Sequence, residues 1–127
     1  MERDGVVEAL GAEVVSQLGV VWRVLNVYVP PESVTGVCEE AFGRLRVLGS
    51  DECWLVCGDF NGHHPAWDRH VPVNARGAQV LQWSVESDLV LMNDGAVTRC
   101  GRGTDSRSAP DVTFCSLTCL RVCSGRW

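Results

Sequence analysis

The sequence contains no lysine, and all 11 of its basic residues are arginine. Arginine suits directed, bidentate contacts with phosphate better than the point charge of lysine does, but a skewed genomic base composition explains the same bias. The 16 acidic residues outnumber the arginines and give the 127-residue chain a net charge of −5. The overall charge therefore does not indicate a nucleic-acid partner.

Long apolar runs are also missing, and no stretch of the sequence is long enough to cross a membrane as a helix. The chain opens with the charged residues Met1-Glu2-Arg3-Asp4 and a short, mixed apolar run, which is not the pattern of a secretory signal peptide. We therefore expect an intracellular protein without membrane association. The length suits one domain, 1–127, and no internal repeat or linker divides it.

The seven cysteines include no CxxC pair. Without secretion we expect no disulfides, and the thiols should behave as small apolar side chains. Cys115, Cys119 and Cys123 recur every four residues, which raises the question of a metal site. No histidine follows at ligand spacing, so the pattern does not favour zinc.

The stretch 53–68 is the most informative part of the sequence. Its first half, Cys53-Trp54-Leu55-Val56-Cys57, is a continuous apolar run typical of a strand buried on both faces. Gly58 ends the run, and Asp59 and Asn61 follow. A carboxylate and an amide just after a buried strand stand where α/β sheets usually build their sites. Since Gly, Asp and Asn are also common turn formers, a plain strand-to-turn junction is the alternative.

Upstream of this stretch, residues 1–18 indicate only a weak helix or a loop. Residues 19–29 predict a central strand, because β-branched and aromatic residues occupy both of its alternating faces. Tyr28 stands near the end of that strand, before a proline pair that terminates it. A helix is expected over 33–48, where apolar side chains recur every three or four residues, so that strand, helix and the strand at 53–58 form a βαβ-like unit.

Downstream, a second helix is expected after Arg76-Gly77. The residues on its expected apolar face are Ala78, Leu81, Val85 and Leu89. Short buried strands are expected at 89–92 and 111–115. The polar, glycine-rich stretch 99–110 between them is expected to be an exposed loop, and it holds Arg99, Arg102 and Arg107.

Three motifs occur in a fixed order: Asn26-Val27-Tyr28-Val29-Pro30, Gly58-Asp59-Phe60-Asn61 and Ser108-Ala109-Pro110-Asp111-Val112-Thr113. Together they resemble the endonuclease/exonuclease/phosphatase superfamily. The loop Gly62-His63-His64-Pro65-Ala66-Trp67 is similar to that of the apurinic-type endonuclease domains of non-LTR retrotransposons. The resemblance runs from about Val20 to the C-terminus. It implies an α/β fold, the DNase I-like α/β sandwich of helices layered on β-sheets, incomplete at both ends.

The resemblance also implies roles for four residues in hydrolysis of phosphodiester bonds with Mg²⁺ or Mn²⁺. Asp59 would bind the metal and polarise or deprotonate the attacking water, and Asn61 would hydrogen-bond that water or a phosphate oxygen. Tyr28 would place its hydroxyl against the scissile phosphate, and Asp111 would orient a catalytic histidine. Hard oxygen ligands suit Mg²⁺, which offsets the charge that builds on the phosphoryl oxygens.

Two departures from the family pattern bear on activity. The metal-binding Glu of the family lies in an N-terminal half that has no counterpart here, since Glu2, Glu8 and Glu13 stand too close to the first recognisable strand. The family also ends in a Ser-Asp-His motif, whereas this sequence ends in Ser124-Gly125-Arg126-Trp127. The resemblance does not make His63, His64 or His70 the missing general acid. We therefore expect a truncated and impaired copy of the domain.

The implied partners are DNA, contacted through Arg99, Arg102 and Arg107, and the reverse transcriptase of the same element, in the nucleus. A solvated surface turn is the alternative interpretation of the arginine loop. Two further functions remain open: a non-catalytic nucleic-acid-binding remnant, and a phosphatase of the same superfamily that acts on small phosphoesters. The retrotransposon-type loop at 62–67 argues against the phosphatase.

Overall fold

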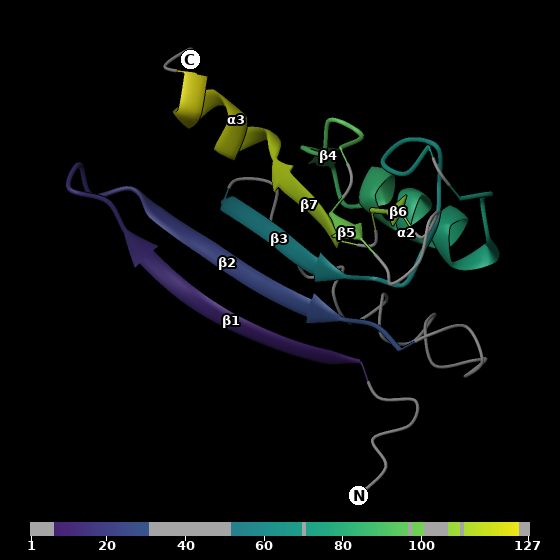
Figure 1. Ribbon diagram of the computed structural model, residues 1–127. Helices are drawn as coiled ribbons and strands as arrows, with labels where there is room; N and C mark the ends of the chain where they lie inside the picture. The colour runs from purple at the N-terminus through teal and green to yellow at the C-terminus, as the bar shows by residue number, and fades with distance from the viewer. Residues whose placement is uncertain are drawn as a thin grey trace, which may run out of the picture.

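A computed structural model describes residues 7–30, 52–69, 71–96, 98–100, 107–109 and 111–124. Its elements are β1 (Glu8–Val15), β2 (Val21–Tyr28), β3 (Cys53–Asp59), α2 (Ala75–Glu86), β4 (Leu89–Leu91), β5 (Arg99–Cys100), β6 (Arg107–Ser108), β7 (Asp111–Ser116) and α3 (Leu117–Ser124). The main sheet has the strand order β1-β2-β3-β7-β4, and β5 pairs with β6 separately (Figure 1). In the main sheet β2 and β3 are parallel and the other neighbours are antiparallel. The fold is of the expected α/β class.

The prediction of a weak helix or loop over 1–18 is wrong for its described part, because β1 is a strand. It pairs along its whole length with β2, from Glu8 opposite Tyr28 to Val15 opposite Val21. The turn between them closes when Ser16 N–H donates to the Val20 carbonyl at 2.9 Å, with Gly19 at a positive φ of 82°. Antiparallel pairing with a neighbouring strand thus overrides a weak local helical pattern.

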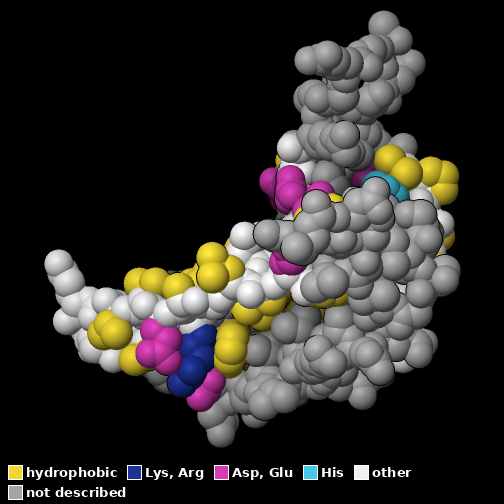
Figure 2. Space-filling view, turned by 90° about the horizontal axis from the view of Figure 1, so that it is seen from below, with side chains coloured by type: hydrophobic (Ala, Val, Ile, Leu, Met, Phe, Trp, Pro, Cys, Tyr) yellow, Lys and Arg dark blue, Asp and Glu magenta, His cyan; other side chains and the backbone are white. Residues whose placement is uncertain are grey.

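The β1–β2 hairpin forms an arm at one edge of the sheet (Figure 1). All eight residues of β1 are exposed, including Leu10 at 75% and Val15 at 63%. Figure 2 shows hydrophobic side chains along this arm. An edge strand with exposed apolar side chains is a surface that favours association with other chains.

The central position predicted for the 19–29 strand is confirmed, since β2 lies between β1 and β3. The strand predicted at 53–58 is β3, which lies between β2 and β7. The helix predicted over 33–48 lies outside the described residues. The predicted strands at 89–92 and 111–115 correspond to β4 and β7.

The second helix is confirmed as α2, but its predicted apolar face is right only for Leu81, which packs partly buried against the core. The residues that α2 buries are Arg76, Gly77, Val80, Trp83 and Ser84. Ala78 is exposed, Val85 is 67% exposed, and Leu89 belongs to β4. A buried stripe that contains an arginine, a glycine and a serine does not look apolar, so hydrophobic periodicity selected the neighbouring stripe instead.

The core lies between α2 and one face of the sheet. Phe114 of β7 is at its centre and makes edge-to-face ring contacts with Phe60, Trp67 and Trp83, at centroid distances of 6.0, 6.5 and 5.8 Å. All four rings are at most 2% exposed. Aromatic pairs in this arrangement stabilise a core beyond the area that they bury.

The opposite face of the sheet is covered at one end by α3, an element that the sequence did not predict. Cys119 of α3 is buried against Cys53 of β3 and Cys115 of β7. Cys115 is at the end of β7 and Cys119 is in the first turn of α3, so their spacing comes from a strand-to-helix junction that packs two small apolar thiols together. The stretch 99–110, predicted as a loop, contains the short pair β5–β6.

The buried face of α2 is tested by two matched substitutions. Val80→Ala removes two methyl groups from a side chain with no exposure and should lower the free energy of unfolding by about 2 kcal/mol. Val85→Ala makes the same chemical change at an exposed position of the same helix and should change it by less than about 0.5 kcal/mol. Urea unfolding followed by tryptophan fluorescence measures both; equal losses would contradict this placement of α2.

Candidate active site

Three of the predicted site residues form one row across the sheet. Tyr28 of β2 is the register partner of Asp59 of β3, and Asp59 is the register partner of Asp111 of β7. Residues directly opposite in neighbouring strands lie on the same face of a sheet. Tyr28 is 43% exposed, Asp111 is exposed and Asp59 is half-buried. The register therefore presents a phenol and two carboxylates side by side.

The row lies on the sheet face opposite α2. Side chains alternate along a strand, and the residues just before and after the row, Val27 of β2 and Val112 of β7, belong to the core under α2. On the face of the row, Asp111 is followed at alternate positions by Thr113 and by Cys115, which α3 covers. The row therefore lies at the end of the sheet away from α3.

Gly58 makes this register possible. It adopts a φ of 147°, and a Cβ there would lie 1.8 Å from the carbonyl oxygen of Val27. Only glycine permits β2 and β3 to approach so closely directly beside Asp59. The glycine that the sequence indicates as the end of an apolar run is thus a packing requirement of the site.

Asn61, the fourth predicted residue, is held against the row by two hydrogen bonds. Its backbone N–H donates to Oδ1 of Asp59 at 2.9 Å, and its Nδ2 donates to the Val29 carbonyl at 2.7 Å. The residue has a φ of 49°, a left-handed conformation that asparagine tolerates well. The first bond restrains the Asp59 carboxylate, and the second leaves the amide oxygen of Asn61 as an acceptor directed away from Val29.

The loop after Asn61 is fixed by a buried indole. Trp67 has no exposed surface, and its Nε1 donates to the Gly62 carbonyl at 3.0 Å. The His64 ring lies over it, with ring centroids 5.3 Å apart. Asn74 caps α2 through Gly77 N–H and accepts from His63 N–H at 2.9 Å. The loop is therefore attached both to the core and to the start of α2.

Asp68 connects this loop to β7 and was not assigned a role from the sequence. Its side chain has no exposed surface, and Oδ2 accepts from Ala109 N–H at 3.0 Å. The same oxygen lies 3.2 Å from Nδ1 of His63. Since Ala109 is two residues before Asp111, the carboxylate of Asp68 fixes the approach of the chain to the row. Nothing in the sequence distinguishes a buried aspartate from an exposed one in a loop.

Asp111 is also fixed by Asn93, two residues after the end of β4. Nδ2 of Asn93 donates to the Asp111 carbonyl at 2.9 Å, and Oδ1 of Asn93 accepts from Thr113 N–H at 2.8 Å. The side chain of Asn93 thus extends the ladder beside β7.

Asp59 and Asp111 are the side chains of the row that suit a divalent metal. Two adjacent carboxylates fit Mg²⁺, which proteins usually bind through one or two carboxylates, several waters and substrate phosphates. Among the residues that the structure describes, no group of three or more His, Cys, Asp or Glu side chains could hold a metal ion. At the row, the described residues therefore offer a metal these two carboxylates and no third such ligand.

Of the three predicted DNA-contacting arginines, Arg102 lies outside the described residues. Arg99 pairs in register with Ser108, and Arg107 pairs with Cys100. The β6 strand runs directly into Ala109, which Asp68 anchors. The β5–β6 pair is thus close in the chain to Asp111.

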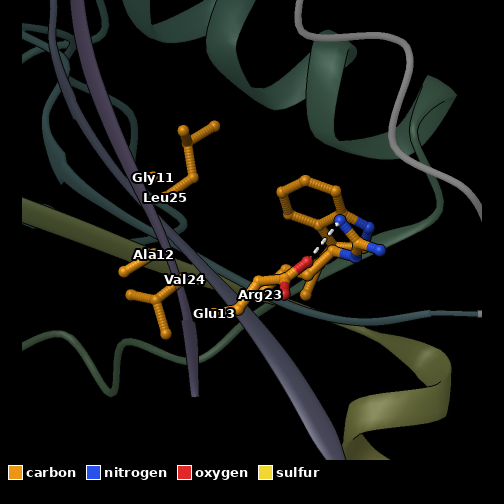
Figure 3. A pocket seen from close by; sticks show the side chains of 7 residues that line it. Gly11, Ala12, Glu13, Arg23, Val24 and Leu25 are labelled. Carbon is orange, nitrogen blue, oxygen red and sulfur yellow. Dashed lines mark ion pairs between the residues drawn. The ribbon is translucent and has the colours of Figure 1, made fainter.

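A hollow of about 220 Å³ lies elsewhere, beside residues 11–13 of β1, 23–25 of β2 and Trp54 of β3 (Figure 3). Arg23 lies there 3.1 Å from Glu13 and 5.8 Å from the centroid of the Trp54 ring. Trp54 is five residues before Asp59 in β3, so this hollow is separate from the row. No predicted site residue lines it, and we do not place the active site there.

No helix among the described residues is long and apolar enough to span a membrane. Comparison with curated proteins finds no match. Among solved structures, the chain is similar to the endonuclease domain of TRAS1, a telomere-specific non-LTR retrotransposon, with 21% identity and a TM-score of 0.63. The alignment covers 88% of this chain and 52% of that one, so the chain spans about half the length of the TRAS1 domain.

A family model also matches, described as endonuclease-reverse transcriptase, over residues 22–126. This range contains the three motifs and the whole row of Tyr28, Asp59 and Asp111. The chain therefore belongs to the endonuclease-reverse transcriptase family and has a partial DNase I-like endonuclease fold.

Proposed function

We propose that this chain is part of a Mg²⁺-dependent endonuclease domain of a non-LTR retrotransposon, which hydrolyses phosphodiester bonds of DNA in the nucleus. Its partners would be the target DNA and the reverse transcriptase of the same element. The observation that carries the proposal is the row of Tyr28, Asp59 and Asp111 with Asn61 held beside it. The family match supports an activity on nucleic acid.

In the proposed mechanism each residue of the row acts on one part of the reaction. Asp59 polarises or deprotonates the attacking water, and Asn61 accepts a hydrogen bond from that water through its amide oxygen. The Tyr28 hydroxyl donates to an oxygen of the scissile phosphate. When bound, Mg²⁺ stabilises the charge that builds on the phosphoryl oxygens. Preorganised groups of this kind cost no reorganisation during the reaction.

The role of Asp111 in this mechanism depends on a histidine partner. In the family resemblance it orients a catalytic histidine. The Ser-Asp-His motif that carries this histidine does not occur in the 127 residues. Loss of a general acid typically lowers the rate about 10²–10⁴-fold. We infer that this chain by itself is an impaired nuclease.

A second candidate function is nucleic-acid binding without cleavage. The position of β5–β6, directly before the anchored Ala109 and Asp111, favours it. Arg99, Arg102 and Arg107 would supply the phosphate contacts. Phosphate contacts make affinity for DNA depend strongly on salt.

Mg²⁺ binding tests the row directly. In an NMR titration, Mg²⁺ should shift the backbone signals of Asp59, Asn61 and Asp111. Asp59→Asn should weaken the Mg²⁺ affinity at least about tenfold, since even residues that only orient metal ligands contribute that much. Asp94→Asn is the matched control, because Asp94 is exposed and also accepts a backbone hydrogen bond, from Ala96. Shifts centred on any other region would contradict the assignment.

Plasmid nicking tests the function. With Mg²⁺ and excess protein, the purified chain should nick supercoiled DNA slowly, and Asp59→Ala should reduce nicking to the background rate. Rapid nicking that depends on Asp59 would show that the chain is not impaired. Binding of DNA with no Asp59-dependent nicking would favour the second function, and neither binding nor nicking would overturn both.

The contribution of the arginines is measured by the salt dependence of DNA binding. Replacing Arg99 and Arg107 together with Ala should lower the slope of log affinity against log salt by about 2, because each arginine that neutralises a phosphate contributes close to 1. Arg121→Ala, in the exposed part of α3, should leave the slope unchanged. Equal slopes for the double variant and the wild type would identify β5–β6 as an ordinary surface turn.

A further inference from the structure

Arg76, the second residue of α2, is a buried cation close to the row. Its side chain is only 3% exposed. Its Nη1 donates to the carbonyl oxygen of Pro30 and lies 3.4 Å from that of Phe60. Burial of a guanidinium costs free energy unless hydrogen bonds compensate the loss of water, so its position at these two carbonyls is a specific feature of the fold.

The two carbonyls lie just past the ends of β2 and β3, the strands that carry Tyr28 and Asp59 of the row. Pro30 is two residues after Tyr28, and Phe60 directly follows Asp59. The last backbone bond between these strands is from Val29 N–H to the Asp59 carbonyl, at 2.9 Å. Beyond this bond, the side chain of Arg76 connects the segment that follows β2 with the segment that follows β3. We call this connection the Arg76 bridge.

The bridge and Asn61 act on the same few atoms. Nδ2 of Asn61 donates to the Val29 carbonyl, one residue before the carbonyl that Arg76 holds. Displacement of Pro30 would therefore move Val29 and, through it, the amide group of Asn61. Arg76 thus affects Asn61 without contacting it.

Close contact of α2 with the loop places Arg76 here. A Cβ on Gly77 would lie 2.0 Å from the carbonyl oxygen of His63, so only glycine lets α2 approach the loop this closely. Asn74 accepts from both Gly77 N–H and His63 N–H, which fixes the start of α2 relative to the loop. The guanidinium is then directed between the ends of β2 and β3.

We propose that Arg76 is a positioning residue of the active site: it holds Tyr28 and Asn61 in their places relative to Asp59 and so sets the affinity of the row for Mg²⁺ and phosphate. This inference rests on the proposed function. A structural bridge would affect stability alone, whereas a positioning residue changes the geometry and affinity of the row even where the fold is intact.

The test compares Arg76→Gln with two controls. Arg76→Gln removes the bridge and should weaken Mg²⁺ binding at Asp59 about 10–100-fold, as expected for a residue that orients metal ligands. Val80→Ala destabilises the same helix without altering the bridge, and Arg121→Gln removes an exposed arginine. The Mg²⁺ affinity of both control variants should stay within about twofold of the wild-type value. Arg76→Lys keeps a buried cation and should give an intermediate affinity.

Two results would overturn the inference. One is a folded Arg76→Gln protein that binds Mg²⁺ with wild-type affinity. The other is a Val80→Ala protein whose Mg²⁺ affinity falls as much as that of Arg76→Gln, because the loss would then follow from lower stability alone. If Arg76→Gln does not fold, the Mg²⁺ affinity of Arg76→Lys is the test. Wild-type affinity in Arg76→Lys would overturn the inference.

A metal-free measurement separates this inference from the proposed function. The side-chain amide protons of Asn61 should shift in Arg76→Gln and Arg76→Lys and not in Arg121→Gln, because the Val29 carbonyl moves. If wild type does not bind Mg²⁺ at Asp59, the proposed function fails, and these amide shifts still show whether Arg76 positions Asn61. Unchanged amide signals in both Arg76 variants would overturn the positioning role.

Discussion

The register of three neighbouring strands is the constraint on which the rest of the structure depends. Parallel pairing of β2 with β3 places Tyr28 beside Asp59, and antiparallel pairing of β3 with β7 places Asp111 on the other side. A shift of one residue in either pairing would turn a member of the row toward α2. The close approach at Gly58 makes that shift sterically costly, because a neighbouring residue with a Cβ cannot replace the glycine.

The core stabilises this register from the face under α2. Phe114 of β7 is in contact with Phe60, Trp67 and Trp83, which come from the end of β3, the following loop and α2. One ring thus joins the end of β3, the following loop and α2 to β7, and the row itself lies on the opposite, accessible face. Separation of a rigid apolar face from a polar face is the usual way in which a sheet supports a site.

Polar side chains hold the parts of the site that the ladder does not reach. Asp68 fixes the approach to Asp111, Asn93 extends β7, and Arg76 bridges the ends of β2 and β3. Each acts on backbone N–H or carbonyl groups that would otherwise lie unsatisfied where strands end. In the β1–β2 arm, Arg23 of β2 pairs with Glu13 of β1 and with Glu52 just before β3, while the apolar side chains of β1 lie open on the surface.

The sequence by itself determined the strands β2 and β3 and the existence of α2, and its ordered motifs pointed to four candidate site residues, because apolar runs, turn residues and motifs are local signals. Only the tertiary structure decided that residues 8–15 form a strand, that α2 buries Arg76 and Gly77 rather than Ala78 and Val85, and that Asp68 and Arg76 frame the row. Strand pairing and the burial of polar side chains depend on partners distant in the chain. No local pattern specifies such partners, so these features became visible only once the chain was folded.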